Sequence, residues 1–209
     1  MDKGIIDTIK TEMDRVTKDA QWSTPIVESP LPPFEPFASI KRISRGCTIT
    51  EKLDGTNGLI CVLEDGRVLA GSRKRWISEH DDNMGFANWV AKNADELRTV
   101  LGVGKHYGEW WGKGIQRGYG LKEKRFSLFN TSRWNQDTTP KCCSVVPVLF
   151  EGIFTTDAVE TVLKALEVGG SAAAPGFYKP EGVVIYMSAA NCYFKKTLGG
   201  DGHKSAKSS

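Results

Sequence analysis

The spacing of apolar residues predicts a short helix, an extended connector and one mixed domain. Apolar side chains recur near helical spacing over residues 1–19, which is typical of an amphipathic helix. Residues 24–36 contain five prolines. Because proline is disfavoured inside helices and central strands, we expect an extended connector there, which completes an N-terminal region over 1–36. The main domain is expected to cover 37–198, and the polar segment 199–209 is expected to be a disordered tail.

Within the main domain, strand-like segments outnumber helical ones and follow one another in hairpin order. Residues 47–73 predict strand, turn, strand, with Asp65-Gly66 as a hairpin turn and residues 52–55 in a loop between strands. Further strands are predicted at 107–111, 126–129, 145–150, 182–187 and 191–196. One helix is predicted over 82–100, and a second begins at Asp157, with Glu160 as its capping partner and Gly169 as its stop. This order predicts an α+β fold with antiparallel sheets and a cleft.

Composition narrows the class of protein. The chain has 209 residues, of which 40% are hydrophobic, and this is enough for one sizeable core. Its five cysteines include no Cys-x-x-Cys pair and no histidine partner at zinc spacing, so we expect reduced thiols and no zinc site. The sequence lacks the apolar run of a signal peptide or a membrane span, which predicts a soluble, cytoplasmic protein with no membrane partner. The net charge of +3 permits nucleic-acid binding, and basic clusters at 41–45, 73–75 and 122–125 favour it.

One segment carries the strongest candidate chemistry. Residues 51–58 read Glu-Lys-Leu-Asp-Gly-Thr-Asn-Gly, in which a lysine precedes an acidic residue and a glycine. Alone this pattern is weak, but five more segments follow it in order: Ser72-Arg73, Gly108-Glu109-Trp110, Phe126-Ser127-Leu128-Phe129, Glu181-Gly182-Val183-Val184-Ile185 and Phe194-Lys195-Lys196. The ordered set, over about 37–196, resembles the nucleotidyltransferase motifs of ATP-dependent RNA and DNA ligases and mRNA capping enzymes. The Thr-Glu-Lys-x-Asp-Gly-Thr-Asn form is most similar to the RNA ligase branch.

The resemblance implies a fold and a reaction. The fold is an α+β nucleotidyltransferase (ATP-grasp-like) domain, in which helices flank two antiparallel sheets and ATP binds in a central cleft. Lys52 would be the nucleophile that attacks the α-phosphorus of ATP, giving a lysyl-AMP phosphoramide and pyrophosphate. A free lysine has a pKa of about 10.4, so the amine must lose a proton before it attacks. Lys195 matches a second catalytic lysine, which contacts the α-phosphate and helps the nucleophile lose that proton.

The same resemblance implies roles for the remaining motif residues. The nucleotide-binding set comprises Glu51 at adenine, Asp54 and Asn57 at ribose or phosphate, Arg73 at the nucleotide or an RNA end, Glu109 at ribose, Phe129 stacked on adenine, Glu181, Lys195 and Lys196. The implied cofactors are ATP and a divalent cation, Mg²⁺ or Mn²⁺, with Glu181 and Glu109 as metal ligands.

Two positions depart from the family pattern. Asn130 stands where aspartate is usual, which removes a charge beside Phe129. Thr197 stands where a second lysine is usual. Lys196 is the nearest substitute, but neighbouring residues of a strand point to opposite faces.

Several of these residues also have a simpler structural interpretation. Asp54 and Asn57 suit a turn in any protein. Glu109, between apolar neighbours, suits a buried ion pair, and Phe129 suits an ordinary core. The basic run 73–75 suits a solvated surface.

The favoured function is an ATP-dependent RNA ligase that adenylylates Lys52, passes AMP to a 5′-phosphate end and joins that end to a 3′-hydroxyl. The partners are therefore nucleic-acid ends, with RNA favoured over DNA. Alternatives are a minimal DNA ligase, a capping-type guanylyltransferase, and a non-catalytic nucleotide- or nucleic-acid-binding module of the same fold. The chain ends within fifteen residues of Lys195, where relatives usually carry a C-terminal domain, so an accessory protein is expected in its place.

Overall fold

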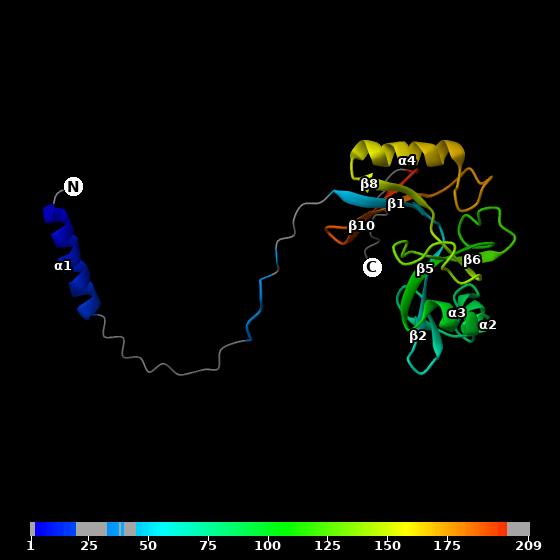
Figure 1. Cartoon of the computed structure of the whole chain (residues 1–209), viewed down its shortest axis with the longest axis horizontal. Helices are drawn as coiled ribbons and strands as arrows, with labels where there is room; N and C mark the ends of the chain where they lie inside the picture. Colours follow the sequence, from blue (N-terminus) through cyan, green and yellow to red (C-terminus); the bar gives the residue numbers. More distant parts are fainter. Residues whose placement is uncertain (1–2, 20–32, 38, 40–44, 200–209) are drawn as a thin grey trace, which may run out of the picture. The chain divides into compact units, whose positions relative to one another are not determined.

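The computed structural model describes residues 3–19, 33–37, 39 and 45–199, which belong to two compact units. The first unit, Met1–Ile40, contains the helix α1 (Lys3–Asp19), where the apolar spacing predicted one (Figure 1). Residues 24–32 of the predicted connector, the tail beyond 199 and most of the basic cluster at 41–45 lie outside the described residues. The domain boundaries near 37 and 198 therefore stay predictions. Among the described helices, none has the length and apolar character of a membrane span.

The second unit, Lys41–Ser209, is built on two sheets. The smaller sheet has the order β10-β9-β1-β8, with β1 Gly46–Lys52, β8 Val148–Ile153, β9 Gly182–Met187 and β10 Cys192–Thr197. The larger has the order β4-β3-β2-β5-β6-β7, with β2 Thr56–Val62, β3 Val68–Gly71, β4 Trp76–Ile77, β5 Gly104–Gly112, β6 Lys124–Leu128 and β7 Cys143–Val145. Every neighbouring pair is antiparallel except β6 and β7. The predicted α+β class is confirmed.

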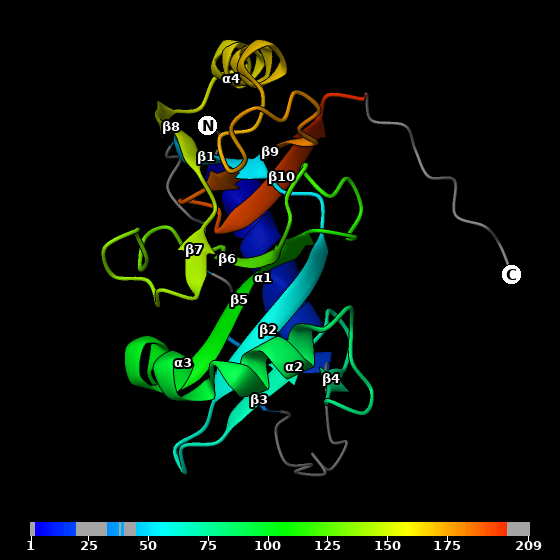
Figure 2. The same cartoon turned by 90° about the vertical axis from the view of Figure 1, so that its right-hand side faces the viewer.

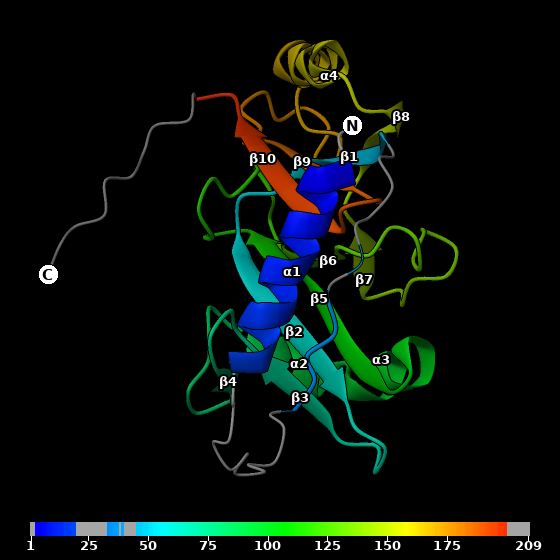
Figure 3. The ribbon, with the colours of Figure 1, turned by 90° about the vertical axis from the view of Figure 1, so that its left-hand side faces the viewer.

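Each sheet has its own helices. The helices of this unit are α2 Phe86–Lys92, α3 Ala94–Leu101 and α4 Thr156–Gly169. Figures 2 and 3 show, from opposite sides, α4 with the smaller sheet at one end and α2 and α3 with the larger sheet at the other. Val159, Leu163 and Leu166 of α4 pack with Ile49, Val183 and Ile185 of the smaller sheet. Because neighbouring strand residues face opposite ways, Thr48, Thr50, Lys52 and Val184 lie on the face away from α4.

Two predicted elements are each divided in the structure. The helix expected over 82–100 is two helices, α2 and α3, separated at Asn93, whose side-chain amide donates to the Trp89 carbonyl. The strand expected over 145–150 is β7 in one sheet and β8 in the other. Pro147 lies between them, and proline has no N–H for a strand ladder. The chain therefore crosses between the sheets at this proline.

The cap of α4 also differs from the prediction. Its N-cap is Thr155, whose hydroxyl accepts a hydrogen bond of 3.0 Å from the Ala158 N–H, so the helix begins before Asp157. Glu160 does not cap the helix, because its carboxylate forms an ion pair with Lys196 of β10. The capping box predicted from Asp157 and Glu160 was wrong.

Candidate active site

Lys52 is the last residue of β1 rather than part of the loop that the sequence predicted. It pairs with Gly182 at the start of β9, so the ladder between β1 and β9 fixes its backbone. The turn that follows is pressed against β5. A Cβ at Gly55 would collide with the Trp110 carbonyl and lie 2.8 Å from Trp111 Cβ, so only glycine fits there. The glycine of the motif thus holds the lysine at a fixed place against β5.

The Lys52 ammonium donates a hydrogen bond of 2.7 Å to Glu181 Oε2. Glu181 immediately precedes β9, and its carboxylate reaches Lys52 because the next residue, Gly182, is the strand partner of Lys52. Gly182 has a φ of 152°, and a Cβ at this position would lie 2.7 Å from Thr197 Cα in β10. Because residue 182 is a glycine, β1, β9 and β10 pack closely at this point. The preceding residue, Glu181, then has its carboxylate beside Lys52.

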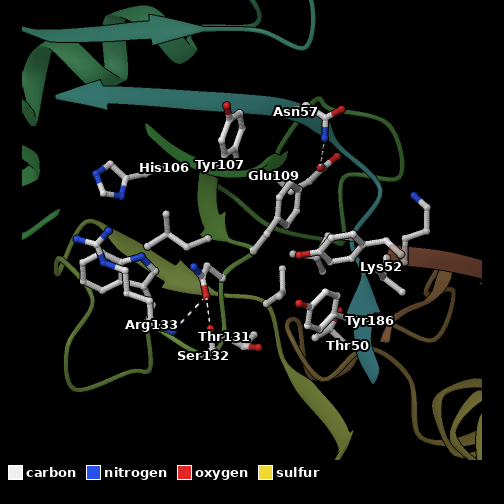
Figure 4. Close-up of a pocket in the computed structure, with 18 of the residues that line it drawn as sticks. Thr50, Lys52, Asn57, His106, Tyr107, Glu109, Thr131, Ser132, Arg133 and Tyr186 are labelled. Atoms are coloured by element: carbon white, nitrogen blue, oxygen red, sulfur yellow. Dashed lines mark hydrogen bonds between the residues drawn. The ribbon is translucent and has the colours of Figure 1, made fainter. Parts of the chain in front are cut away.

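Glu109 is the second carboxylate near Lys52. It lies opposite Asn57 in the β2–β5 ladder and is only 8% exposed. Its Oε1 accepts from the Gly55 N–H at 3.1 Å. Its Oε2 accepts from the Asn57 side-chain amide at 3.3 Å, as Figure 4 shows. Burial raises the pKa of Glu109 from 4.5 to about 7, although the positive charge of Lys52 opposes the rise. The site therefore holds a carboxyl group that titrates near neutral pH beside the lysine.

This pKa predicts how stability depends on pH. Since the pKa of Glu109 is about 7 in the folded chain against 4.5 for an ordinary glutamate, the folded state holds this proton more tightly than the unfolded state. The resulting stability is present below the unfolded value and is lost as pH rises through the folded one, by about 3 kcal/mol in all. We expect Glu109→Gln to flatten this dependence, measured by urea unfolding in a chelating buffer at mildly acidic and mildly alkaline pH. The exposed Glu123→Gln is the control, and an equal slope in wild type and Glu109→Gln would contradict the expectation.

Lys52 and Glu109 line a cavity of about 910 Å³, within the usual range for small-molecule sites, and Glu181 reaches it through its hydrogen bond with Lys52. Figure 4 shows Lys52 and Tyr186 at one end of it and His106 and Arg133 at the other. The cavity brings together much of the predicted set: Glu51, Lys52, Asn57, Arg73, Glu109 and Phe129 line it, with Thr48, Thr50, Val184 and Tyr186 of the smaller sheet.

Phe129 follows β6 and is 39% exposed, so the interpretation as an ordinary core residue was wrong. Its face is available to a ligand in the cavity. Asn130 shapes the turn that follows. Its side-chain oxygen accepts from the Ser132 hydroxyl at 2.7 Å and from the Arg133 N–H at 3.1 Å. The residue that departs from the family pattern thus has a local structural role.

Two predicted binding residues turn their charged groups away from the cavity. The Glu51 carboxylate lies on the α4 face, because it precedes Lys52 in the strand; it accepts from the Ser171 hydroxyl and from two backbone N–H groups. Glu51 is 1% exposed, and burial raises the pKa of its carboxyl group. Lys196 lies on this same face in its ion pair with Glu160. The predicted contact of the Glu51 side chain with adenine and the predicted nucleotide-binding role of Lys196 are therefore withdrawn.

Lys195 has the orientation that the predicted contact with the α-phosphate would require. It is the strand partner of Val184, so its side chain leaves β10 on the cavity face, where it is exposed. Thr197, two residues further, shares this face.

The sequence did not point to the residues that surround Asp54. Arg117 Nε donates to Asp54 Oδ2 at 2.8 Å, and the Tyr119 hydroxyl accepts from the Asp54 N–H at 2.8 Å. Both come from the glycine-rich loop after β5, to which the sequence motifs assign no role. The sequence does contain a signal here, because an arginine and an aromatic residue between glycines are typical of a loop that contacts a ligand or another segment of the chain.

Comparison with known proteins gives a family match over most of the chain. The model of the RNA ligase family matches residues 46–198. Among solved structures, a Naegleria gruberi RNA ligase mutant with ATP and Mn has a TM-score of 0.54 and 18% identity, covering 73% of this chain and 49% of that chain. A mutant of the same ligase with AMP and Mn has a TM-score of 0.53 at 18% identity, with the same coverage. This chain thus spans about half the length of these proteins. No curated protein sequence matches it significantly.

Proposed function

This chain belongs to the RNA ligase family, and from that premise we propose that it is an ATP-dependent RNA ligase. It adenylylates its own Lys52, passes AMP to a 5′-phosphate end of RNA and joins that end to a 3′-hydroxyl. The observation that carries the proposal is the Lys52 amine in the cavity wall, 2.7 Å from one carboxylate and beside a second. A lysine held in this way is positioned to act as a nucleophile, unlike an ordinary surface lysine that only contacts water.

In the first step, the Lys52 nitrogen attacks the α-phosphorus of ATP. A P–N bond forms, the bond from the α-phosphorus to the bridging oxygen breaks, and pyrophosphate leaves with that electron pair. The amine must lose its proton before it attacks. Glu181 accepts a hydrogen bond of 2.7 Å from the Lys52 ammonium. A divalent cation held by Glu181 would offset the charge of this carboxylate and so weaken its ion pair with Lys52.

The carboxylates fit a divalent cation. Mg²⁺ commonly takes one or two carboxylates together with substrate phosphates and water. Glu181 and Glu109 supply two, while the described residues contain no cluster of three or more metal-ligating side chains, so phosphate and water would complete the shell. When bound, such a cation neutralises charge on the phosphates. Relatives of known structure hold Mn, and we propose Mg²⁺ or Mn²⁺ here.

Other lining residues account for nucleotide binding. Phe129 lines the cavity and stacks on the adenine. Asn57 contacts the ribose or phosphate, and Arg73 binds phosphate through its planar fork. Lys195 extends from β10 on the same face and contacts the α-phosphate.

Mass spectrometry tests this function directly. After incubation with ATP and Mg²⁺ or Mn²⁺, the chain should gain one AMP, and peptide mapping should locate it on Lys52. GTP in place of ATP tests a capping-type activity. No gain with either nucleotide would leave a non-catalytic binding module, and sealing of DNA ends in preference to RNA ends would make the chain a DNA ligase.

End joining should depend on salt far more than adenylylation does. Arg73 and Lys74 are exposed near the cavity, whereas Arg75 is paired with Asp81. A contact with phosphate releases counterions, so joining should fall steeply between about 50 and about 200 mM salt, while formation of lysyl-AMP changes little. We expect Lys74→Ala to weaken joining and to lower the salt slope by about 1. Lys164→Ala on α4 is the control, and a slope that Lys74→Ala leaves unchanged would place the RNA contact elsewhere.

A further inference from the structure

We propose that Arg117 is a positioning residue that braces the Lys52 turn against the segment leading to Glu181. The inference rests on the proposed function, because the groups it braces are the nucleophile and the candidate metal ligand. Arg117 Nε donates to Asp54 Oδ2 at 2.8 Å, and Asp54 lies two residues after Lys52. Arg117 Nη1 donates to the carbonyls of Lys179 at 3.1 Å and Pro180 at 3.3 Å, immediately before Glu181. One guanidinium group thus joins both sides of the site.

Arginine suits this position for a specific reason. Its planar group carries five N–H donors in a fixed fork, so it can bind a carboxylate with one edge and backbone carbonyls with another. A lysine ammonium could satisfy Asp54 but has no rigid fork to hold the carbonyls as well. The position therefore requires the planar shape of the guanidinium group as well as its positive charge.

The loop that carries Arg117 is itself held firmly. Ile115 is fully buried and Tyr119 is 2% exposed, so the loop is anchored on both sides of Arg117. The Tyr119 ring packs edge-on against Trp111, with centroids 4.9 Å apart, and contacts Phe177 at 4.7 Å. Its hydroxyl also accepts the Asp54 N–H. The loop thus makes two contacts with Asp54, one to its backbone and one to its side chain.

The backbone around Arg117 is also in an unusual conformation. Gln116 has a φ of 45° and Tyr119 a φ of 52°, in the left-handed region that L-residues seldom occupy. Such residues persist where the surrounding contacts hold them, and they concentrate at functional sites. A surface loop with no role would have no need of two such residues beside an arginine.

Charge gives the brace a second effect. Asp54 is a third carboxylate of the site, since its negative charge acts on Glu109 as that of Glu181 does. Paired with Arg117, Asp54 competes less for the lysine or for a cation, because its charge is offset. Arg117 therefore keeps Glu181 as the partner of Lys52 while it fixes the turn.

Removal of Arg117 should misplace the reacting groups without unfolding the domain. The side chain is 39% exposed, and the ladder between β1 and β9 still holds Lys52 beside Gly182. We expect Arg117→Ala to lower the maximal rate of lysyl-AMP formation by about 10- to 100-fold, since misplacement by about 1 Å can cost that much. The KM for ATP should change much less, and the cation concentration for half-maximal rate should rise. Arg117→Lys should recover part of the rate.

Arg125→Ala is the matched control, because Arg125 is 40% exposed and pairs with Glu123 away from the cavity. Single-turnover rates, cation titrations and Tm should be measured for all four proteins. No AMP on wild type would overturn the proposed function and this inference with it. AMP on wild type together with a rate for Arg117→Ala close to that of Arg125→Ala would overturn the inference alone. A drop in Tm with equal loss of rate in Arg117→Ala and Arg117→Lys would also overturn it, as it would show a role in folding.

Discussion

Lys52→Ala is expected to abolish adenylylation while the domain stays folded. The lysine ends β1 with its ammonium at the Glu181 carboxylate, and alanine there removes the only group that this mechanism uses to attack the α-phosphorus. The ion pair is partly exposed, at 24% for Lys52 and 16% for Glu181, so its loss should cost about 1 kcal/mol or less of stability. Intact-mass spectrometry after incubation with ATP and Mg²⁺ or Mn²⁺ measures the effect, and Tm reports the fold.

Two further substitutions separate chemistry from charge. Lys52→Arg keeps a cation beside Glu181 but should fail as completely as alanine, because a guanidinium group stays protonated. Lys105→Ala removes another lysine that lines the same cavity from the far end of β5, and it should keep the label. Transfer of AMP to the Lys52→Ala protein would assign the nucleophile to another residue. Loss of label in Lys105→Ala would mean that cavity charge, and not Lys52 alone, controls the reaction.

The three residues at the centre of the site, Lys52, Glu109 and Glu181, were predicted from their resemblance to ligase motifs, and each lies within three residues of a glycine. Lys52 precedes Gly55, Glu109 follows Gly108 and Glu181 precedes Gly182. Glycine allows the close approach of strands that brings these groups together. At both Gly55 and Gly182 a Cβ would collide with the neighbouring strand. The local sequence thus contained part of the tertiary geometry.

Strand alternation decided which motif residues face the cavity. Lys52 was predicted in a loop but ends β1, and strand alternation therefore turns its neighbour Glu51 to the opposite face. At Lys196 the same rule was applied to a correctly predicted strand, and the structure agrees with it: the side chain lies on the opposite face. The orientation of a residue could be predicted wherever the limits of its strand were correct.

Contacts between distant segments could not be predicted from local sequence patterns. The division of 145–150 between two sheets depends on where β1 and β6 lie, and the apolar run alone looks the same in either sheet. The partners of Arg117 lie more than sixty residues away in both directions, at Asp54 and at the Lys179 and Pro180 carbonyls. No spacing rule relates such positions, so these contacts of Arg117 could be found only in the folded structure.

Glu181→Gln is expected to lower the rate of adenylylation by about a hundredfold or more, since charge stabilisation by a metal is worth several kcal/mol and 1.36 kcal/mol is a factor of ten. The amide keeps the size of the side chain and an oxygen that accepts from Lys52 at the position now 2.7 Å away. It lacks the negative charge that a divalent cation requires of its ligand. Thermal stability should change little, because Glu181 is partly exposed and the ladder between β1 and β9 is untouched.

Glu160→Gln is the matched control for this substitution. Glu160 also pairs with a lysine, Lys196, but on the face of the smaller sheet that packs against α4. Both variants remove one carboxylate from a carboxylate–lysine pair, and only Glu181→Gln should change the rate and the cation concentration for half-maximal rate. Single-turnover kinetics over a range of Mn²⁺ or Mg²⁺ make the comparison. A wild-type rate in Glu181→Gln would move the metal role to Glu109, whose buried carboxyl also feels the charge of Lys52. Glu109→Gln should then show the loss instead.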